Sequence, residues 1–247
     1  MQFFNIILLT ILLIFTASCT TPQKVPIQTK VKKIVKVKSK PKILSLEKSL
    51  QNIGAKVGDP IFMRIFKEEK LLEIWVKVGE GYKLCKTYPV CAYSGELGPK
   101  LKQGDKQSPE GFYTITKKQL KPNSKYHLAL NLGFPNQYDK YQKRTGSYLM
   151  IHGKCSSTGC YAMQNRQIEE IYNMAKNALE NGQSSFEVHI FPFKMTAHNM
   201  AQHTTDKWYP FWVNLKLGYD IFERYNVIPI VKASEDKYKF FMKKNKG

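Results

Sequence analysis

A histidine and a cysteine lie on either side of a short polar loop in the second half of the chain. His152 ends an apolar segment, Gly153 follows it, and Cys160 stands beyond a run rich in glycine, serine and threonine. A cysteine attacks as its thiolate, and a histidine on a neighbouring rigid element is a base that can form it. The arrangement therefore predicts covalent chemistry, with Cys160 as the nucleophile and His152 as the group that takes and returns its proton.

The residue before the cysteine adds a second element of such a site. Gly159 permits a tight turn, because glycine adopts backbone conformations that other residues avoid. That turn can aim the backbone N–H groups of Gly159 and Cys160 at the oxyanion that develops on a carbonyl under attack. We therefore include Gly159 among the predicted catalytic residues.

Structural interpretations of the same cysteines stay open. Cys85, Cys91, Cys155 and Cys160 form an even set that could make two disulfides in an oxidising compartment, and their connectivity does not follow from the sequence. Cys91 with Cys155 is the most natural pairing near the loop. A metal site formed by His152, Cys155 and Cys160 would lack a fourth ligand and the usual spacing, so we predict no metal.

Two further side chains are candidates for contact with a substrate. His127 is a rival base, although its place in a strand equally suits a packed, hydrogen-bonded core histidine. Arg144, in a loop with Thr145 and Gly146, could clamp a carboxylate through two hydrogen bonds or be an ordinary surface arginine. His189 lies in the middle of an apolar strand, and we assign it a structural role.

The elements that must position these residues are mostly strands. Alternating apolar residues predict strands over residues 61–66, 71–78, 82–91, 111–116, 126–132, 148–152 and 186–191. Apolar residues at helical spacing predict helices over 46–53, from Asn165 as a candidate cap to Gly182, and within 208–225. The long polar loops 92–109 and 134–146 are of the kind that builds a site. Strands with packed helices predict an α+β, mainly β fold.

The first part of the chain predicts export. Residues 3–17 are almost wholly apolar, a length that suits a signal peptide better than a membrane span. Small residues precede Cys19, as at a lipoprotein cleavage site. We therefore expect a periplasmic protein anchored through lipidated Cys19, with a signal that carries no lipid as the alternative.

Positive charge is concentrated directly after that segment. The chain carries 39 Lys+Arg against 19 Asp+Glu, and eight of the lysines lie between Cys19 and Leu46 without one acidic residue. Residues 20–45 therefore form a Lys-rich linker that offers no face to bury. Because an exported protein rarely meets nucleic acid, we expect these lysines to face an anionic membrane surface or acidic wall polymers, and we predict no nucleic-acid partner.

Several segments together make the chain resemble the L,D-transpeptidase (YkuD) catalytic-domain family, and in particular its YafK-type subfamily. The His152-Gly153 pair, followed by Ser157 to Cys160, is similar to the family signature. The segments that extend the likeness over most of the chain are Gly58–Lys67, Ser94–Lys100, Gly104–Tyr113, Arg144–Gly146 and Phe191–Phe193. Thr158 departs from the pattern, because most members have a second histidine there, but the departure leaves the Cys-His pair intact.

The resemblance implies a mixed β-sandwich with helices packed on it and a cysteine acyltransferase that acts on peptidoglycan. Cys160 would attack a carbonyl next to the meso-diaminopimelate residue of a stem peptide, and His152 would pass the thiol proton to the leaving amine. The backbone carbonyl of Gly153 would orient the His152 ring. No cofactor is needed for these steps. Residues expected near the substrate are Ser157, Thr158, Arg144 and His127.

The acceptor of the resulting thioester decides the outcome. Transfer to an amine is transpeptidation in cell wall biogenesis, whereas water would make the protein a peptidoglycan amidase or L,D-carboxypeptidase that could also release wall-linked lipoprotein. A non-catalytic wall-binding protein is a third alternative, and the intact Cys160 and His152 argue against it. We expect a signal over residues 1–19, the linker over 20–45, the catalytic domain over 55–195 and a helical extension over 196–247.

Overall fold

The computed structural model describes residues 44–242 of the chain. Cys19, the apolar segment before it and nearly all of the Lys-rich linker lie outside the described residues, so their expected roles stay predictions. Among residues 44–242, none of the helices has the length and apolar character that a membrane span requires.

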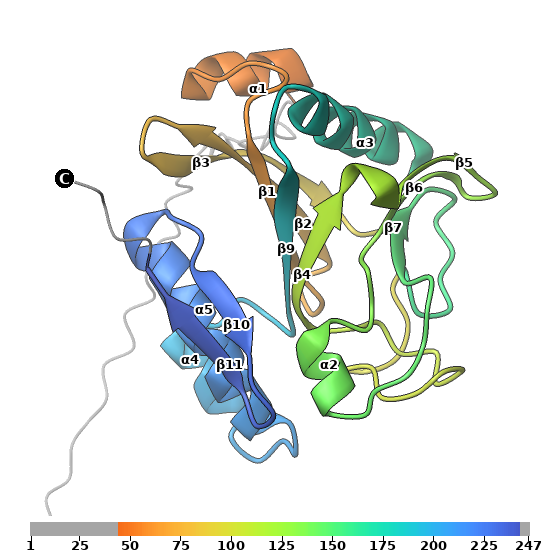
Figure 1. Cartoon of the computed structure of the whole chain (residues 1–247), viewed down its shortest axis with the longest axis vertical. Helices are drawn as coiled ribbons and strands as arrows, with labels where there is room; N and C mark the ends of the chain where they lie inside the picture. Colours follow the sequence, from red (N-terminus) through yellow and green to blue (C-terminus); the bar gives the residue numbers. More distant parts are fainter. Residues whose placement is uncertain (1–43, 243–247) are drawn as a thin grey trace, which may run out of the picture. The chain divides into compact units, whose positions relative to one another are not determined.

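A five-stranded sheet organises the described residues (Figure 1). Its order is β3 (Gly81–Pro89), β2 (Leu71–Val78), β1 (Ile61–Phe66), β9 (Ser185–Phe191) and β4 (Gly111–Thr116). The β1–β9 pair is parallel, and the other pairs are antiparallel. Every residue of β1 is buried, as expected for a central strand that is covered on both faces.

A smaller, four-stranded sheet carries the predicted catalytic segment. Its order is β5 (Leu120–Ser124), β6 (His127–Asn131), β7 (Met150–His152) and β8 (Tyr161–Ala162), and the turn η1 (Lys117–Gln119) precedes β5. Strands β7 and β8 are parallel, so the chain must return to the same end of the sheet between them. The loop over residues 153–160 makes that return, which brings the histidine and the cysteine onto neighbouring strands.

The main apolar core fills the space between the two sheets and helix α3 (Asn165–Glu180). It takes Met63 and Ile65 from β1, Ile151 from β7, and Ile168 and Ile171 from α3. These positions follow the spacings of two in a strand and three in a helix that the sequence periodicity predicts. The fold class, α+β and rich in strands, is therefore confirmed.

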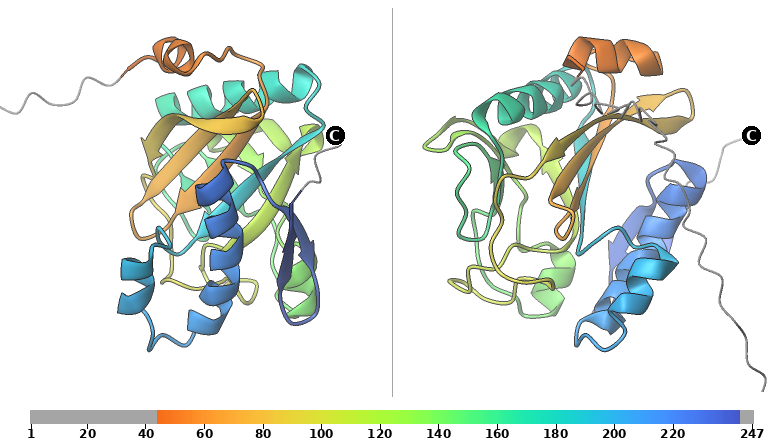
Figure 2. Two further views of the ribbon diagram at one scale, coloured as in Figure 1. Left: turned by 90° about the vertical axis from the view of Figure 1, so that its left-hand side faces the viewer. Right: turned by 180° about the vertical axis from the view of Figure 1, so that it is seen from behind.

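The opposite face of the five-stranded sheet is covered by helix α5 (Tyr209–Tyr225), so α3 and α5 lie on opposite sides of it (Figure 2). A second core joins Phe66 and Phe191 of the sheet to Trp212 and Tyr219 of α5. A buried arginine ties the layers together, because Arg64 on β1 lies 2.8 Å from Glu73 of β2 and 2.5 Å from Glu223 of α5. The remaining elements are α1 (Leu46–Ile53), α2 (Gln137–Tyr141), α4 (Ala197–Gln202), β10 (Ile230–Ala233) and β11 (Tyr238–Phe241).

The structure differs from the sequence prediction at several places. Strands β5 and β8 and helix α2 were not predicted. The region beyond residue 195 is not only helical, because β10 and β11 form a hairpin whose strands are too short to give a clear alternation. The strand expected over 148–152 begins only at Met150, since Tyr148 has a φ of 57° in the left-handed region. Helix α3 is preceded by Gln164 as N-cap, while the Asn165 side chain accepts a hydrogen bond from the Lys154 N–H instead.

His189 is a buried histidine with an unusual apolar environment. Its ring lies 4.6 Å from each of the Phe62 and Phe112 ring centroids, and neither ring nitrogen has a hydrogen-bond partner. Burial, reinforced by the nearby charge of Arg64, lowers the pKa of His189 well below its ordinary value of 6.5. The residue is therefore neutral in the folded protein, which agrees with the structural role predicted from its mid-strand position.

The neutral state of His189 predicts acid-sensitive stability. Below a pH of about 6.5 the unfolded chain binds a proton at His189 while the folded chain does not. The contribution of His189 to stability is therefore fully present above that pH and decreases as the pH is lowered. Replacing His189 with Leu should remove up to about 1.4 kcal/mol of the loss seen on going from pH 7.5 to 5.5. Urea unfolding of both proteins at the two pH values measures this difference, since every other titrating group is common to them. Equal losses would contradict a neutral, buried His189.

Candidate active site

The strand register brings His152 and Cys160 together. His152 pairs with Ala162 and Ile151 with Tyr161 across the parallel β7–β8 ladder, so two steps back from the His152 pair set Met150 beside Cys160, just before β8. Side chains alternate between the faces of a sheet, and directly paired residues in a parallel ladder share a face. His152 and Cys160 therefore lie on the same face of the smaller sheet, as diagonal neighbours on adjacent strands.

The imidazole of His152 is held by its own chain. The side chain is buried, with 2% of its surface exposed, and Nδ1 lies 2.6 Å from the carbonyl oxygen of Gly153. Because a carbonyl only accepts hydrogen bonds, Nδ1 carries the proton of the neutral ring and Nε2 is left as the basic atom. The contact that the resemblance implies for Gly153 is present. Burial lowers the pKa of His152, and the Gly153 carbonyl opposes that shift.

Cys160 is a partly buried, free thiol beside the start of β7. Its Sγ–H donates a weak hydrogen bond to the carbonyl oxygen of Tyr148, at 3.6 Å. Burial raises the pKa of the thiol, while the backbone N–H of Met150 and the charge of Lys100 lower it. Since the two pKa values move in directions that favour thiol and imidazole, the resting pair is uncharged.

The turn before Cys160 is closed by Ser157. The Ser157 hydroxyl donates to the Cys160 carbonyl at 2.7 Å and accepts from the Gly159 N–H at 3.1 Å. Gly159 has a φ of 130°, and a Cβ there would lie 3.3 Å from Leu149 Cδ1. The predicted oxyanion donor is therefore at the expected turn, where Ser157 holds it in the resting state. Thr158 is exposed at the outside of this turn.

A disulfide between Cys91 and Cys155 fixes the other end of the loop. It ties the segment after β3 to the loop between His152 and Cys160. Cys85 is a buried free thiol whose pKa is raised by burial to about 11. The interpretations of Cys160 as half of a disulfide and of Cys155 as a metal ligand are therefore wrong, because Cys155 is bonded to Cys91 and Cys160 is free.

A buried ion pair organises the loop that borders this site. The Lys67 ammonium lies 3.0 Å from Glu110 Oε1 and contacts the backbone carbonyls of Glu96, Gly98 and Ser108 at 2.7, 2.9 and 3.2 Å. Glu110 also accepts hydrogen bonds from the Gly98 N–H and from the indole of Trp212 on α5. Both charged side chains have no exposed surface. Burial lowers the pKa of Lys67, against the opposing effect of Glu110.

This ion pair is connected to the backbone of Cys160 through Ser108. Ser108, whose carbonyl binds Lys67, uses its hydroxyl to donate to the carbonyl of Cys160 at 3.1 Å. The neighbouring Pro109 carbonyl accepts from the Tyr161 hydroxyl at 2.7 Å. The 108–110 turn thus supports the backbone on both sides of the Cys160 peptide. Sequence reasoning gave Lys67 and Glu110 no role, because they are 43 residues apart and neither carries a local signal of pairing.

His127 lies away from the interior. Its side chain is 36% exposed, and Nε2 is 2.6 Å from Glu169 Oε1 on α3. The interpretation as a packed core histidine is therefore wrong. Its roles as rival base and as substrate contact stay predictions, since its described hydrogen bond is to Glu169 and not to Cys160.

Arg144 is buried, which contradicts its interpretation as a surface arginine. Its Nη1 lies 2.9 Å from Asp139 Oδ1, and the guanidinium packs 5.2 and 5.0 Å from the ring centroids of Tyr138 and Phe211. The side chain has 5% of its surface exposed. Its contact with a substrate carboxylate stays a prediction, and in the resting structure the guanidinium anchors the 134–146 loop on α2.

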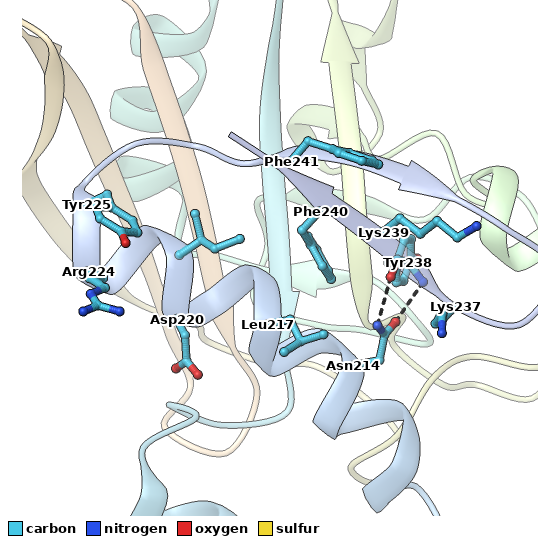
Figure 3. A pocket seen from close by; sticks show the side chains of 11 residues that line it. Asn214, Leu217, Asp220, Arg224, Tyr225, Lys237, Tyr238, Lys239, Phe240 and Phe241 are labelled. Carbon is cyan, nitrogen blue, oxygen red and sulfur yellow. Dashed lines mark hydrogen bonds between the residues drawn. The ribbon is translucent and has the colours of Figure 1, made fainter. Parts of the chain in front are cut away.

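An open groove of about 660 Å³ lies between α5 and β11 (Figure 3), and neither Cys160 nor His152 lines it. Leu217 and Phe241 are among the residues that line it, and Asn214 hydrogen-bonds to the backbone of Tyr238 at one end. The groove holds none of the residues that the sequence predicted for a site. The residues for which the sequence predicted chemistry therefore lie at the smaller sheet and not at this groove.

Comparison with known proteins identifies the family to which this chain is similar. A model of the L,D-transpeptidase catalytic domain, YkuD, matches residues 62–190, which include His152 and Cys160. The Escherichia coli strain K12 protein named "Putative L,D-transpeptidase YafK" is 50% identical over 182 residues, which are 74% of this chain and 74% of that protein. Both findings confirm the resemblance drawn from the sequence.

Two solved structures are similar to the chain at low identity. The helical cell shape determining protein Pgp2 from Campylobacter jejuni has a TM-score of 0.44 and 19% identity, over 78% of this chain and 83% of that chain. Bd1075 from Bdellovibrio bacteriovorus has a TM-score of 0.38 and 22% identity, over 66% of this chain and 62% of that chain.

The buried ion pair gives a stability prediction. Replacing Lys67 with Met should leave the Glu110 carboxylate buried without its cation and destabilise the protein by about 3–5 kcal/mol. Urea unfolding at neutral pH measures the change. The matched double variant Lys67→Met/Glu110→Gln should lose less than the sum of the two single losses, because it removes both charges together. Additive losses would mean that the two side chains do not stabilise each other.

Proposed function

The chain belongs to the L,D-transpeptidase catalytic-domain (YkuD) family, and we propose on that basis that it is a cysteine acyltransferase acting on the stem peptides of peptidoglycan. The observation that carries the proposal is the free Cys160 thiol on the same sheet face as His152, whose Nδ1 is bound by the Gly153 carbonyl. The name of the Escherichia coli relative, a transpeptidase, supports transfer as the activity.

In the proposed reaction, His152 Nε2 takes the proton of Cys160 as Sγ bonds to a carbonyl carbon of the stem peptide, next to meso-diaminopimelate. The oxyanion would accept hydrogen bonds from backbone N–H groups of the 159–160 turn. The C–N bond then breaks, and His152 returns the proton to the departing amine, which leaves a thioester on Cys160. An acceptor amine attacks that thioester, and the thiol is regenerated.

The electrostatics of the pair suit this sequence of proton transfers. The lowered pKa of His152 favours the neutral ring, whose Nε2 can accept a proton. The raised pKa of Cys160 keeps the thiol protonated until the base acts. The pair therefore moves its proton during catalysis and not before it.

Loss of either member of the pair should abolish turnover. Cys160→Ala and His152→Ala are each expected to lower kcat on a tetrapeptide muropeptide by roughly three orders of magnitude or more, because nucleophile and base act as one unit. Mass spectrometry of the products measures the effect, and circular dichroism checks the fold. Cys85→Ala, which removes the other free thiol among the described residues, is the matched control and should retain activity.

The same product analysis separates transfer from hydrolysis. Dimers joined through two diaminopimelate residues would support the proposed acyl transfer. Shortened stem peptides alone, or lipoprotein released with a free terminal Lys or Arg, would replace it with the amidase or carboxypeptidase activity on the same residues. Wild-type turnover that survives the loss of Cys160 would contradict both.

We also propose that the enzyme works in the periplasm, held at the membrane through lipidated Cys19 and close to anionic lipid through its Lys-rich linker. The Cys91–Cys155 disulfide supports an oxidising compartment, because such bonds form and persist outside the cytosol. The apolar segment before Cys19 supports export.

The anchor predicts a change in fractionation. Cells that express the full chain should incorporate labelled palmitate into the protein and retain it in the membrane fraction. Cys19→Ala should lose the label and move to the soluble periplasmic fraction, because a lipid chain supplies most of the membrane affinity of such a protein. Label that persists in the Cys19→Ala variant would exclude Cys19 as the attachment site.

A further inference from the structure

The ring of Tyr126 covers the catalytic histidine. Its centroid lies 4.4 Å from that of His152, with the two ring planes tilted by 30°. Tyr126 is half-buried and comes from the two-residue turn between β5 and β6, whereas His152 ends β7. Two aromatic rings at this distance are in van der Waals contact, so the Tyr126 ring limits rotation of the imidazole about its side-chain bonds.

The turn that carries Tyr126 is held in a strained shape. The register of the β5–β6 pair shifts between Lys121 and Ser124, and the Tyr126 N–H donates to the Ser124 hydroxyl at 3.1 Å. His127, the next residue, has a φ of 77°, in the left-handed region where glycine is favoured after such a turn. The His127 side chain reaches Glu169 of α3 at 2.6 Å, which anchors the strained residue to the helix.

The same turn also holds the backbone that orients His152. The Gly153 N–H is shared between the carbonyls of Tyr126 and Leu128, at 3.0 and 3.2 Å. A Cβ at residue 153 would lie only 2.8 Å from the Tyr126 carbonyl oxygen, so the close approach requires glycine there. Tyr126 therefore fixes the Gly153 peptide with its backbone and the imidazole with its ring. The Gly153 carbonyl in turn binds Nδ1.

We propose that Tyr126 is a positioning residue for His152, whose ring sets the plane of the imidazole and keeps water from it so that Nε2 stays directed toward Cys160. The inference rests on the proposed function only in naming His152 as the base. It also gives His127 a role that neither sequence interpretation provided, because the His127–Glu169 pair anchors the turn from which Tyr126 projects.

Removing the ring should change the titration of the base. Burial is the main cause of the lowered pKa of His152, and part of that burial comes from Tyr126. The ionisable groups around this assembly are Lys125, with Nζ 5.1 Å from the Tyr126 ring centroid, the His127–Glu169 pair and the Cys160 thiol on the neighbouring strand. They are unchanged in a variant of Tyr126 alone, so a shift in the titration reports the loss of the ring.

The experiment compares Tyr126→Ala with Tyr126→Phe in the full protein. The pKa of His152 is measured from the NMR signals of its ring, assigned with His152→Gln. Tyr126→Ala should raise that pKa toward 6.5 and lower kcat on the muropeptide by about 10- to 100-fold through misplacement of the base. Tyr126→Phe keeps the ring and should match the wild type in both measurements. Tyr126→Leu, which keeps an apolar side chain without the ring, should behave like Tyr126→Ala and replaces it if the alanine variant does not fold.

The His152 titration tests the positioning role of Tyr126, and muropeptide turnover by the wild type tests the proposed function, so the two proposals can be rejected independently. A His152 titration that is unchanged in Tyr126→Ala and Tyr126→Leu overturns the positioning role, whatever the activity. A shifted titration with unchanged kcat also overturns it, because the ring would then shield the imidazole without aligning it. If the wild type does not turn over muropeptides, the proposed function fails. In that case the NMR comparison still decides whether Tyr126 holds His152.

Discussion

A buried lysine–glutamate pair is the constraint on which the surroundings of Cys160, the proposed nucleophile, depend. Lys67 and Glu110 have no exposed surface, and two charges in an apolar interior are tolerated only where their hydrogen-bonding atoms have partners. The chain meets this requirement with backbone carbonyls from the 92–109 loop around the ammonium and with the Trp212 indole on the carboxylate. The loop and α5 are therefore held where they can supply hydrogen bonds to the two buried charges. Ser108 extends this network to Cys160, because its hydroxyl donates to the Cys160 carbonyl.

The same constraint joins the region beyond residue 195 to the sheet and to the loop that borders the proposed site. Trp212 reaches across from α5 to Glu110, while Arg64 joins β1 to Glu223 on the same helix. Helix α5 thus completes two buried charged groups of the five-stranded sheet and covers its second apolar face. A helical extension that is merely packed on a finished domain would contribute apolar contacts only, whereas α5 also supplies the Trp212 indole to Glu110 and the Glu223 carboxylate to Arg64.

The sequence predicted the parts of this structure that depend on local pattern. Strands such as β1 and helices such as α3 follow from the spacing of apolar residues, and the Cys160–His152 pair follows from a signature within one loop. The Lys67–Glu110 pair could not be predicted, because each residue resembles an ordinary surface charge until the fold brings them together. The interpretation of Arg144 as a surface arginine was wrong for the same reason, since its burial depends on Tyr138 and on Phe211 of α5. Tyr126 gave no signal, because its role comes from a turn in which His127 occupies a position that favours glycine.

The Lys67–Glu110 pair is charged at all times, whereas the Cys160–His152 pair would be charged only during a reaction. The permanent pair, Lys67 and Glu110, lies in the interior with its partners supplied in advance, so it needs no rearrangement. The proposed catalytic pair is linked to it through Ser108 and is neutral at rest, because burial disfavours both the Cys160 thiolate and a protonated His152. In the proposed reaction, Cys160 and His152 become charged only when the sulfur attacks a substrate carbonyl. The Gly159 N–H, which would have to turn toward that charge, donates to Ser157 at rest, and the turn that contains both residues is supported by the buried pair through Ser108. A fixed ion pair therefore gives the neutral pair the rigid surroundings that brief charge separation requires.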